Sequence, residues 1–130
     1  MTKENKDVLV LDGSNYAIYS IDLLDKILGK EVKLVDRFYE ATDELDTNKY
    51  GVVLTEPMMC FTRIHMREEY RNFLADIRTN RNIPVVLYST QDKGTIDNDW
   101  GLVQGTHYDS YICKQVGASK LLKETLEKLL

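Results

Sequence analysis

Residues 8–17 read VLVLDGSNYA, and this stretch predicts the first strand, turn and helix of the fold. Four consecutive apolar residues are typical of a strand that is buried on both faces, as in a parallel sheet. The run ends at Asp12, the polar turn 13–15 follows, and a helical spacing of apolar residues begins at Ala17. Asp12 is therefore the first candidate for a functional residue, with capping of the first helix as its alternative role.

The rest of the chain repeats this alternation of strand and helix. Further strands are predicted at 31–36, 52–56, 83–90 and 109–113, and helices at 17–28, about 39–45, 66–79 and 118–130, the last capped by Ser119. The polar, glycine-containing segment 91–107 predicts a short or irregular helix. This order favours one parallel sheet with helices on both faces, whose functional site lies at the carboxyl ends of the strands. The side chains at these ends are Asp12, Asp36, Glu56, Ser89, Thr90 and Lys114.

Size and charge limit the classes of function. A chain of 130 residues suffices for one core, so we predict a single domain over 1–130 with a flexible N-terminus at 1–6. Its 17 basic and 21 acidic residues give a formal charge of −4, which argues against a sequence-independent nucleic-acid binder. No apolar run is long enough for a membrane span. Cys60 and Cys113 lack metal-ligand spacing, so we predict a cytoplasmic protein with reduced cysteines and no zinc.

Four segments resemble the receiver domain of two-component response regulators, and together they cover the chain from about Lys6 to its end. VLVLDGS (8–14) is similar to the first strand of that family, and YGVVLTEPMMC (50–60) to the third strand with its Met-rich turn. IPVVLYST (83–90) resembles the fourth strand and GTHYDSYICKQ (105–115) the fifth. The resemblance implies the CheY-like, flavodoxin-like α/β fold, a (βα)5 doubly wound sandwich with five parallel strands in the order 2-1-3-4-5.

The resemblance also implies the residues of a phosphorylation pocket. Glu56 falls on the phospho-acceptor position and Ser89 on the position where the family keeps Thr or Ser. Lys114 falls on the pocket lysine and Tyr111 on the switch aromatic. Asp12 remains from the pair of acids that normally ends the first strand, which makes it a weak Mg²⁺ candidate.

Two departures from the family pattern predict a degenerate pocket, that of a pseudo-receiver. Gly13 replaces the second acid of the first strand, which removes one oxygen ligand from a Mg²⁺ site. Glu56 replaces an aspartate and lengthens the side chain by about 1.5 Å, and a misplacement of about 1 Å can lower a rate roughly a hundredfold. We therefore expect no catalytic residue, no cofactor, and Mg²⁺ only if the pocket still functions. In place of phosphate we predict a permanent Glu56–Lys114 ion pair, with Ser89 hydrogen-bonded to Glu56 and Tyr111 turned inward.

The function implied is a non-enzymatic signalling module that binds a partner protein. In receivers the partner face comprises the fourth helix, the fifth strand and the fifth helix. Trp100 and Tyr108 belong to this region and are candidates to anchor a partner or a homodimer, with packing inside the loop as the alternative. No nucleic-acid or membrane partner is expected.

Two other functions stay open. A receiver that still takes phosphate would need Asp36 or Asp92 to replace the missing acid. In a different class, LDGSN (11–15) resembles the first strand of PIN-like or NYN-like nucleases, which hold two metal ions about 4 Å apart. No later acidic cluster of that kind follows in the sequence, and the net negative charge disfavours RNA.

Overall fold

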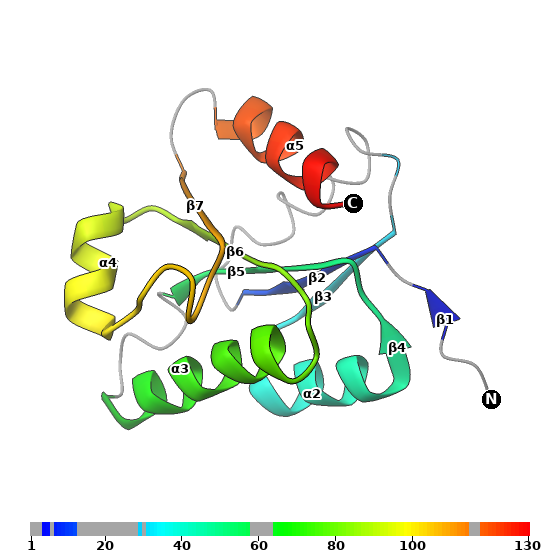
Figure 1. The fold of residues 1–130 in the computed structure, drawn as a ribbon, viewed down its shortest axis with the longest axis horizontal. Helices are drawn as coiled ribbons and strands as arrows, with labels where there is room; N and C mark the ends of the chain where they lie inside the picture. Colours follow the sequence, from blue (N-terminus) through cyan, green and yellow to red (C-terminus); the bar gives the residue numbers. More distant parts are fainter. Residues whose placement is uncertain (1–3, 6, 13–28, 30, 58–63, 115–117) are drawn as a thin grey trace.

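Five strands form one parallel sheet in the computed structural model, which describes residues 4–5, 7–12, 29, 31–57, 64–114 and 118–130 (Figure 1). The strands are β2 (Val8–Leu11), β3 (Val32–Val35), β5 (Val52–Thr55), β6 (Val85–Ser89) and β7 (Ser110–Cys113). Their order across the sheet is β3-β2-β5-β6-β7. Numbered along the chain, this is the predicted order 2-1-3-4-5, so the flavodoxin-like α/β fold is confirmed.

Four described helices cover the sheet. They are α2 (Phe38–Thr47), α3 (Ile64–Thr79), α4 (Lys93–Trp100) and α5 (Ala118–Leu129). Figure 1 shows α5 over one face of the sheet and α2 and α3 over the other. The predicted helix at 17–28 lies outside the described residues. Ser119 is the second residue of α5, and its predicted role as the cap of this helix stays a prediction. No described helix combines the length and the apolar character that a membrane span requires.

The core has two layers because successive side chains of a strand point to opposite faces of the sheet. On one face Val10, Leu54 and Ile112 pack with Leu122 and Leu126 of α5. On the other face the apolar residues of the strands pack with those of α2, α3 and α4, and this larger cluster includes Leu9, Leu11, Val53, Leu87, Tyr70, Leu74, Ile96 and Trp100. The central strands β2, β5 and β6 are therefore mostly apolar, because both of their faces are buried.

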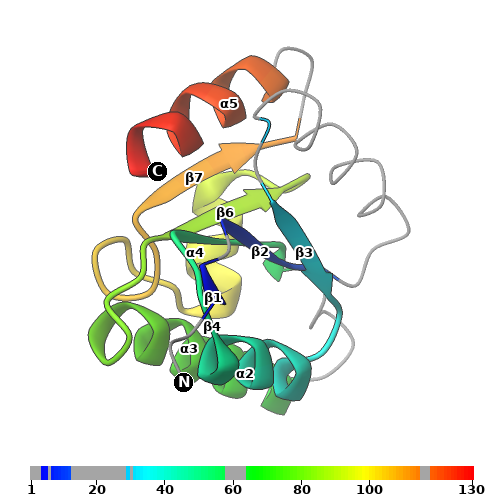
Figure 2. The same ribbon diagram turned by 90° about the vertical axis from the view of Figure 1, so that its right-hand side faces the viewer.

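A second, two-stranded sheet was not predicted. It joins β1 (Glu4–Asn5) in parallel to β4 (Asn48–Lys49), which follows α2 directly (Figure 2). The expectation of a flexible segment at 1–6 stays a prediction, while Glu4 and Asn5 pair with β4. Both strands are short and polar, so they carry no hydrophobic periodicity that a sequence pattern would detect.

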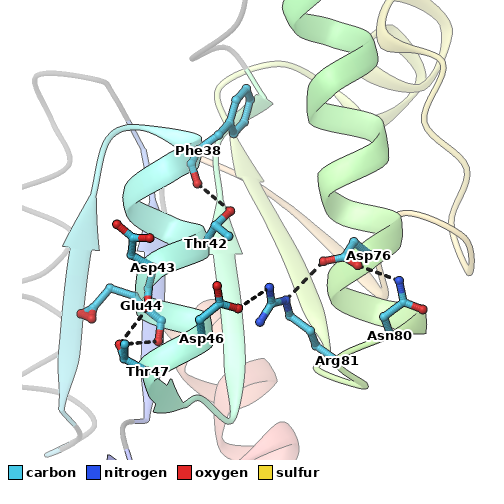
Figure 3. Close-up of polar contacts among 9 residues, drawn as sticks. All are labelled: Phe38, Thr42, Asp43, Glu44, Asp46, Thr47, Asp76, Asn80 and Arg81. Atoms are coloured by element: carbon cyan, nitrogen blue, oxygen red, sulfur yellow. Dashed lines mark hydrogen bonds and ion pairs between the residues drawn. The ribbon is translucent and has the colours of Figure 1, made fainter.

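Polar contacts join the C-terminal ends of α2 and α3, at the opposite edge of the sheet from the strand ends that carry Asp12 and Glu56. Arg81 lies between the two helices, with Nη2 at 2.8 Å from Asp46 Oδ1 and Nε at 3.2 Å from Asp76 Oδ2 (Figure 3). Asn80 Nδ2 donates to the second oxygen of Asp76. These bonds link the two helices through carboxylates that are exposed to water.

Candidate functional site

Asp12, Glu56 and Lys114 come together because each follows directly after a strand of the parallel sheet. Leu11 and Thr55 are paired residues of neighbouring strands, so the two acids after them leave the sheet side by side. The backbone keeps this register beyond the strands, because the Glu56 N–H donates to the Leu11 carbonyl at 3.2 Å. Lys114 is held in the same way, since its N–H donates to the Ser89 carbonyl at 2.7 Å.

The ammonium group of Lys114 bridges the two acids. Its Nζ lies 3.2 Å from Glu56 Oε2 and 3.4 Å from Asp12 Oδ2. The predicted Glu56–Lys114 contact is present, whereas the contact with Asp12 was not predicted. The Lys114 Nζ also lies 5.0 Å from the centre of the Tyr88 ring, close enough for a cation–π interaction.

This group of charges is almost completely enclosed. The side chains of Glu56 and Asp12 are 4% and 6% exposed, and that of Lys114 is 17% exposed. Buried charges are stable only when they are paired or hydrogen-bonded. In the described part of the chain, the ammonium of Lys114 supplies this pairing for both carboxylates.

Ser89 and Tyr111 lie beside the charged group and share a partner in Gln91. The buried hydroxyl of Ser89 accepts a hydrogen bond from the Gln91 N–H at 3.2 Å, and the Tyr111 hydroxyl donates to the Gln91 carbonyl. Burial raises the pKa of Tyr111 to about 12, and the negative charge of Glu56 acts in the same direction. Tyr111 therefore stays a protonated donor, half-buried against the core. The predicted hydrogen bond between Ser89 and Glu56 stays a prediction.

Asp12 and Glu56 are the two described acids that a receiver-type Mg²⁺ site would use. Mg²⁺ needs octahedral oxygen ligands at short range, whereas Asp12 and Glu56 already share a lysine ammonium within 3.4 Å. Within the described part of the chain, no three residues among His, Cys, Asp and Glu gather so that they could hold a metal ion. Asp92, one of the acids considered as a replacement, caps α4 by accepting from the Thr95 N–H at 2.8 Å. The other, Asp36, is exposed and lies 3.9 Å from Arg37.

Trp100 and Tyr108 are buried, so the interpretation that they anchor a partner is wrong and the alternative of interior packing holds. Their exposed fractions are 3% and 0%. Trp100 meets the edge of Tyr70 with ring centres 6.3 Å apart, and Tyr108 donates to Asp97 at 2.9 Å. Both rings belong to the core cluster that the strands form with α2, α3 and α4 on this face of the sheet.

Comparisons with known proteins give the same fold as the geometry. No protein-family model matches the sequence, and no significant match was found among curated proteins. The structure is similar to that of a CheY-like receiver domain protein from Methanospirillum hungatei, with a TM-score of 0.67 and 17% identity over 97% of this chain and 94% of that one.

Two further solved structures that are similar to this one contain magnesium. One is the receiver domain of a sensor histidine kinase from Pseudomonas aeruginosa with a magnesium ion in its active-site cleft, with a TM-score of 0.71, 14% identity, and coverage of 96% of this chain and 97% of that one. The other is a response regulator from Thermotoga maritima in complex with Mg²⁺ and beryllofluoride, with a TM-score of 0.64, 21% identity, and coverage of 96% and 99%. Over nearly its whole length, this chain therefore has the fold of CheY-like receiver domains.

Proposed function

We propose that this protein is a receiver-type signalling module that binds a partner protein without being phosphorylated. The observation that carries the proposal is the position of Lys114, whose ammonium bridges Glu56 and Asp12 at 3.2 and 3.4 Å. Because Glu56 falls on the acceptor position, its carboxylate places a permanent negative charge near the point where a phosphoryl group would be attached. The lysine that would contact that group is already paired.

The pocket in this proposal positions charge and performs no catalysis. Glu56 holds Lys114, Lys114 neutralises part of the charge of two buried acids, and Tyr111 remains hydrogen-bonded to the Gln91 carbonyl. Buried charge pairs of this kind do not rearrange cheaply, because removing one partner leaves an uncompensated charge in a medium of low dielectric constant. We therefore expect the module to keep one conformation whether or not a phosphoryl donor is present.

We place the partner surface on α4, β7 and α5. Two large apolar side chains support this choice, Val103 in the segment between α4 and β7 and Leu121 in α5, which are 54% and 49% exposed. They replace Trp100 and Tyr108 as the candidate contacts. The alternative is a homodimer through the same face, which would be detected as a molecular mass in solution that rises with protein concentration.

The second candidate is a receiver that still accepts phosphate. Asp12, Ser89 and Lys114 stand at the positions that match the family pattern, and two structures of the same fold contain magnesium. The nuclease hypothesis has no such support, since no group of three His, Cys, Asp or Glu residues that could hold a metal ion gathers in the part of the chain that the structure describes.

An amide NMR titration separates the two receiver candidates. We expect the signals of residues 12, 56, 89 and 114 to stay in place when millimolar Mg²⁺ and then beryllofluoride are added. The positive control is the double variant Gly13→Asp/Glu56→Asp, which restores both acids of the family pattern and should respond. If the unaltered protein responds to both additions, with Tyr111 shifting as well, the proposal is overturned in favour of a working receiver.

A further inference from the structure

Helix α4 is weak by its own sequence. It spans eight residues, KGTIDNDW, and contains a glycine, a threonine, an asparagine and two aspartates, all poor helix formers. Its last turn contains no basic residue, and Asp97 and Asp99 place negative charge at the end of the helix that already carries a partial negative charge. Isolated helices of this length are not stable in water. The ordered form of α4 must therefore depend on contacts with the rest of the protein.

Two arginines of α3 supply the cations that the end of α4 lacks. Arg67 Nη1 donates to the Asp99 carbonyl at 3.0 Å, and Arg71 Nη1 donates to the Trp100 carbonyl at 3.0 Å. These are terminal carbonyls that have no partner within a helix. The guanidinium of Arg67 also lies 4.5 Å from the centre of the Trp100 ring. Gly101, which ends the helix with φ of +64°, lies against the stem of Arg71.

A third arginine of α3 holds the segment that follows α4. Arg78 binds both carboxylate oxygens of Asp109, with Nε at 3.0 Å from one and Nη2 at 2.7 Å from the other. Its Nη1 donates to the Gly105 carbonyl. The same carboxylate accepts from the Val85 N–H at 2.8 Å, which ties the segment to the start of β6.

The three arginines lie on one face of α3, because positions four and eleven residues apart fall on the same side of an α-helix. We call Arg67, Arg71 and Arg78 the arginine ladder. Helix α3 itself is fixed to the core strand β5, since the Tyr70 hydroxyl lies 2.9 Å from Thr55 Oγ1 in a buried hydrogen bond. The ladder thus extends from a rigid helix to a segment that has little stability of its own.

We propose that the arginine ladder is a conformational device that determines whether α4 and residues 101–109 are folded. With the ladder in place this segment is ordered. Without it the segment opens locally while the sheet stays folded, because such low-stability units can unfold separately from the core. The inference rests on the proposed function only in naming this region as part of the partner surface.

Amide hydrogen exchange followed by NMR tests this device. The double variant Arg67→Met/Arg71→Met keeps two apolar stems and removes both charges. The loss of a hydrogen bond to a charged group lowers the free energy that is needed to open α4. We therefore expect the amides of α4 to exchange roughly tenfold faster or more. Amides of β5 and β6 should exchange at their original rates. The matched control is Arg37→Met, which removes an exposed arginine near α2 and should leave α4 unchanged.

Two single variants extend the test. Arg78→Met should speed exchange in residues 102–109 more than in α4, and Arg71→Lys, which keeps a cation, should retain more protection in α4 than Arg71→Met. If the double variant does not fold, the exchange rates of α4, β5 and β6 are compared between Arg71→Met and the unaltered protein. The proposal is overturned if α4 keeps its exchange rates, or if all amides accelerate equally. These outcomes do not involve Mg²⁺ or beryllofluoride, so a failure here is distinguishable from a failure of the proposed function.

Discussion

Replacing Lys114 with methionine removes the ammonium group that bridges Glu56 and Asp12 and keeps a side chain of similar length. The carboxylates that remain are 4% and 6% exposed, and both lose the positive charge that lies between them. Removing one partner of a buried ion pair costs about 3–5 kcal/mol, because the other charge remains in a medium of low dielectric constant. Lys114 reaches the surface with 17% of its side chain, so water can screen part of the loss. We therefore expect Lys114→Met to lower the free energy of unfolding by about 3 kcal/mol at pH 7.

Urea unfolding and thermal melting measure this loss. For a domain of this size the expected fall in melting temperature is roughly 10 °C. Glu56→Gln leaves Lys114 paired with Asp12 and should cost about 1 kcal/mol. The double variant Glu56→Gln/Lys114→Met should be more stable than Lys114→Met, since it contains one buried carboxylate fewer. The control is Lys120→Met, which removes an exposed lysine from α5.

Two results would refute the reasoning. A loss below about 1 kcal/mol for Lys114→Met would mean that the bridge behaves like a surface salt bridge. A double variant as unstable as Lys114→Met would mean that the methionine is tolerated poorly for steric reasons and that the two charges are not coupled.

Two further predictions concern charged contacts outside the pocket. Burial acts to raise the pKa of Asp109, but the hydrogen bonds from Arg78 and from the Val85 N–H, together with the positive charge of Arg78, outweigh it and hold that pKa below its usual value. A carboxylate of this kind adds stability above the pKa that it has in the unfolded chain, and the contribution is lost as the pH falls through its folded-state pKa. Asp109→Asn should therefore lower the free energy of unfolding by about 2 kcal/mol at pH 7. The difference in this free energy from the unaltered protein should shrink below about pH 4. A difference that does not change with pH contradicts this account. Arg81→Met breaks the contacts with Asp46 and Asp76. Because both carboxylates are exposed to water, it should lower the free energy of unfolding, measured in urea, by less than about 1 kcal/mol. A loss comparable to that of Lys114→Met would show that the ends of α2 and α3 depend on this arginine.

The sequence determined the topology and the edge of the sheet where the site lies. Apolar runs of four or five residues identify strands that are buried on both faces, and their alternation with helices leaves few arrangements other than a parallel sheet. Once the strands are parallel, the residues that follow them meet at one edge. Local patterns therefore predicted that Asp12, Glu56 and Lys114 lie at one edge of the sheet, whereas the strand order that puts Glu56 next to Asp12 and the contact of Lys114 with Glu56 were predicted from the resemblance to receiver domains.

Only the tertiary structure decided which side chains touch beyond that edge. Lys114 contacts Asp12 across 102 positions of sequence, and this contact depends on strand register and on the direction in which one flexible side chain extends. The same holds for Trp100, which an amphipathic pattern cannot assign to the inside or the outside of an eight-residue helix. The arginine ladder had a sequence signal in its common helix face, but its acceptors are backbone carbonyls of another helix, and every residue type has such a carbonyl. A pattern of side chains predicts burial and periodicity, whereas pairing between distant groups follows from the packing of the whole chain.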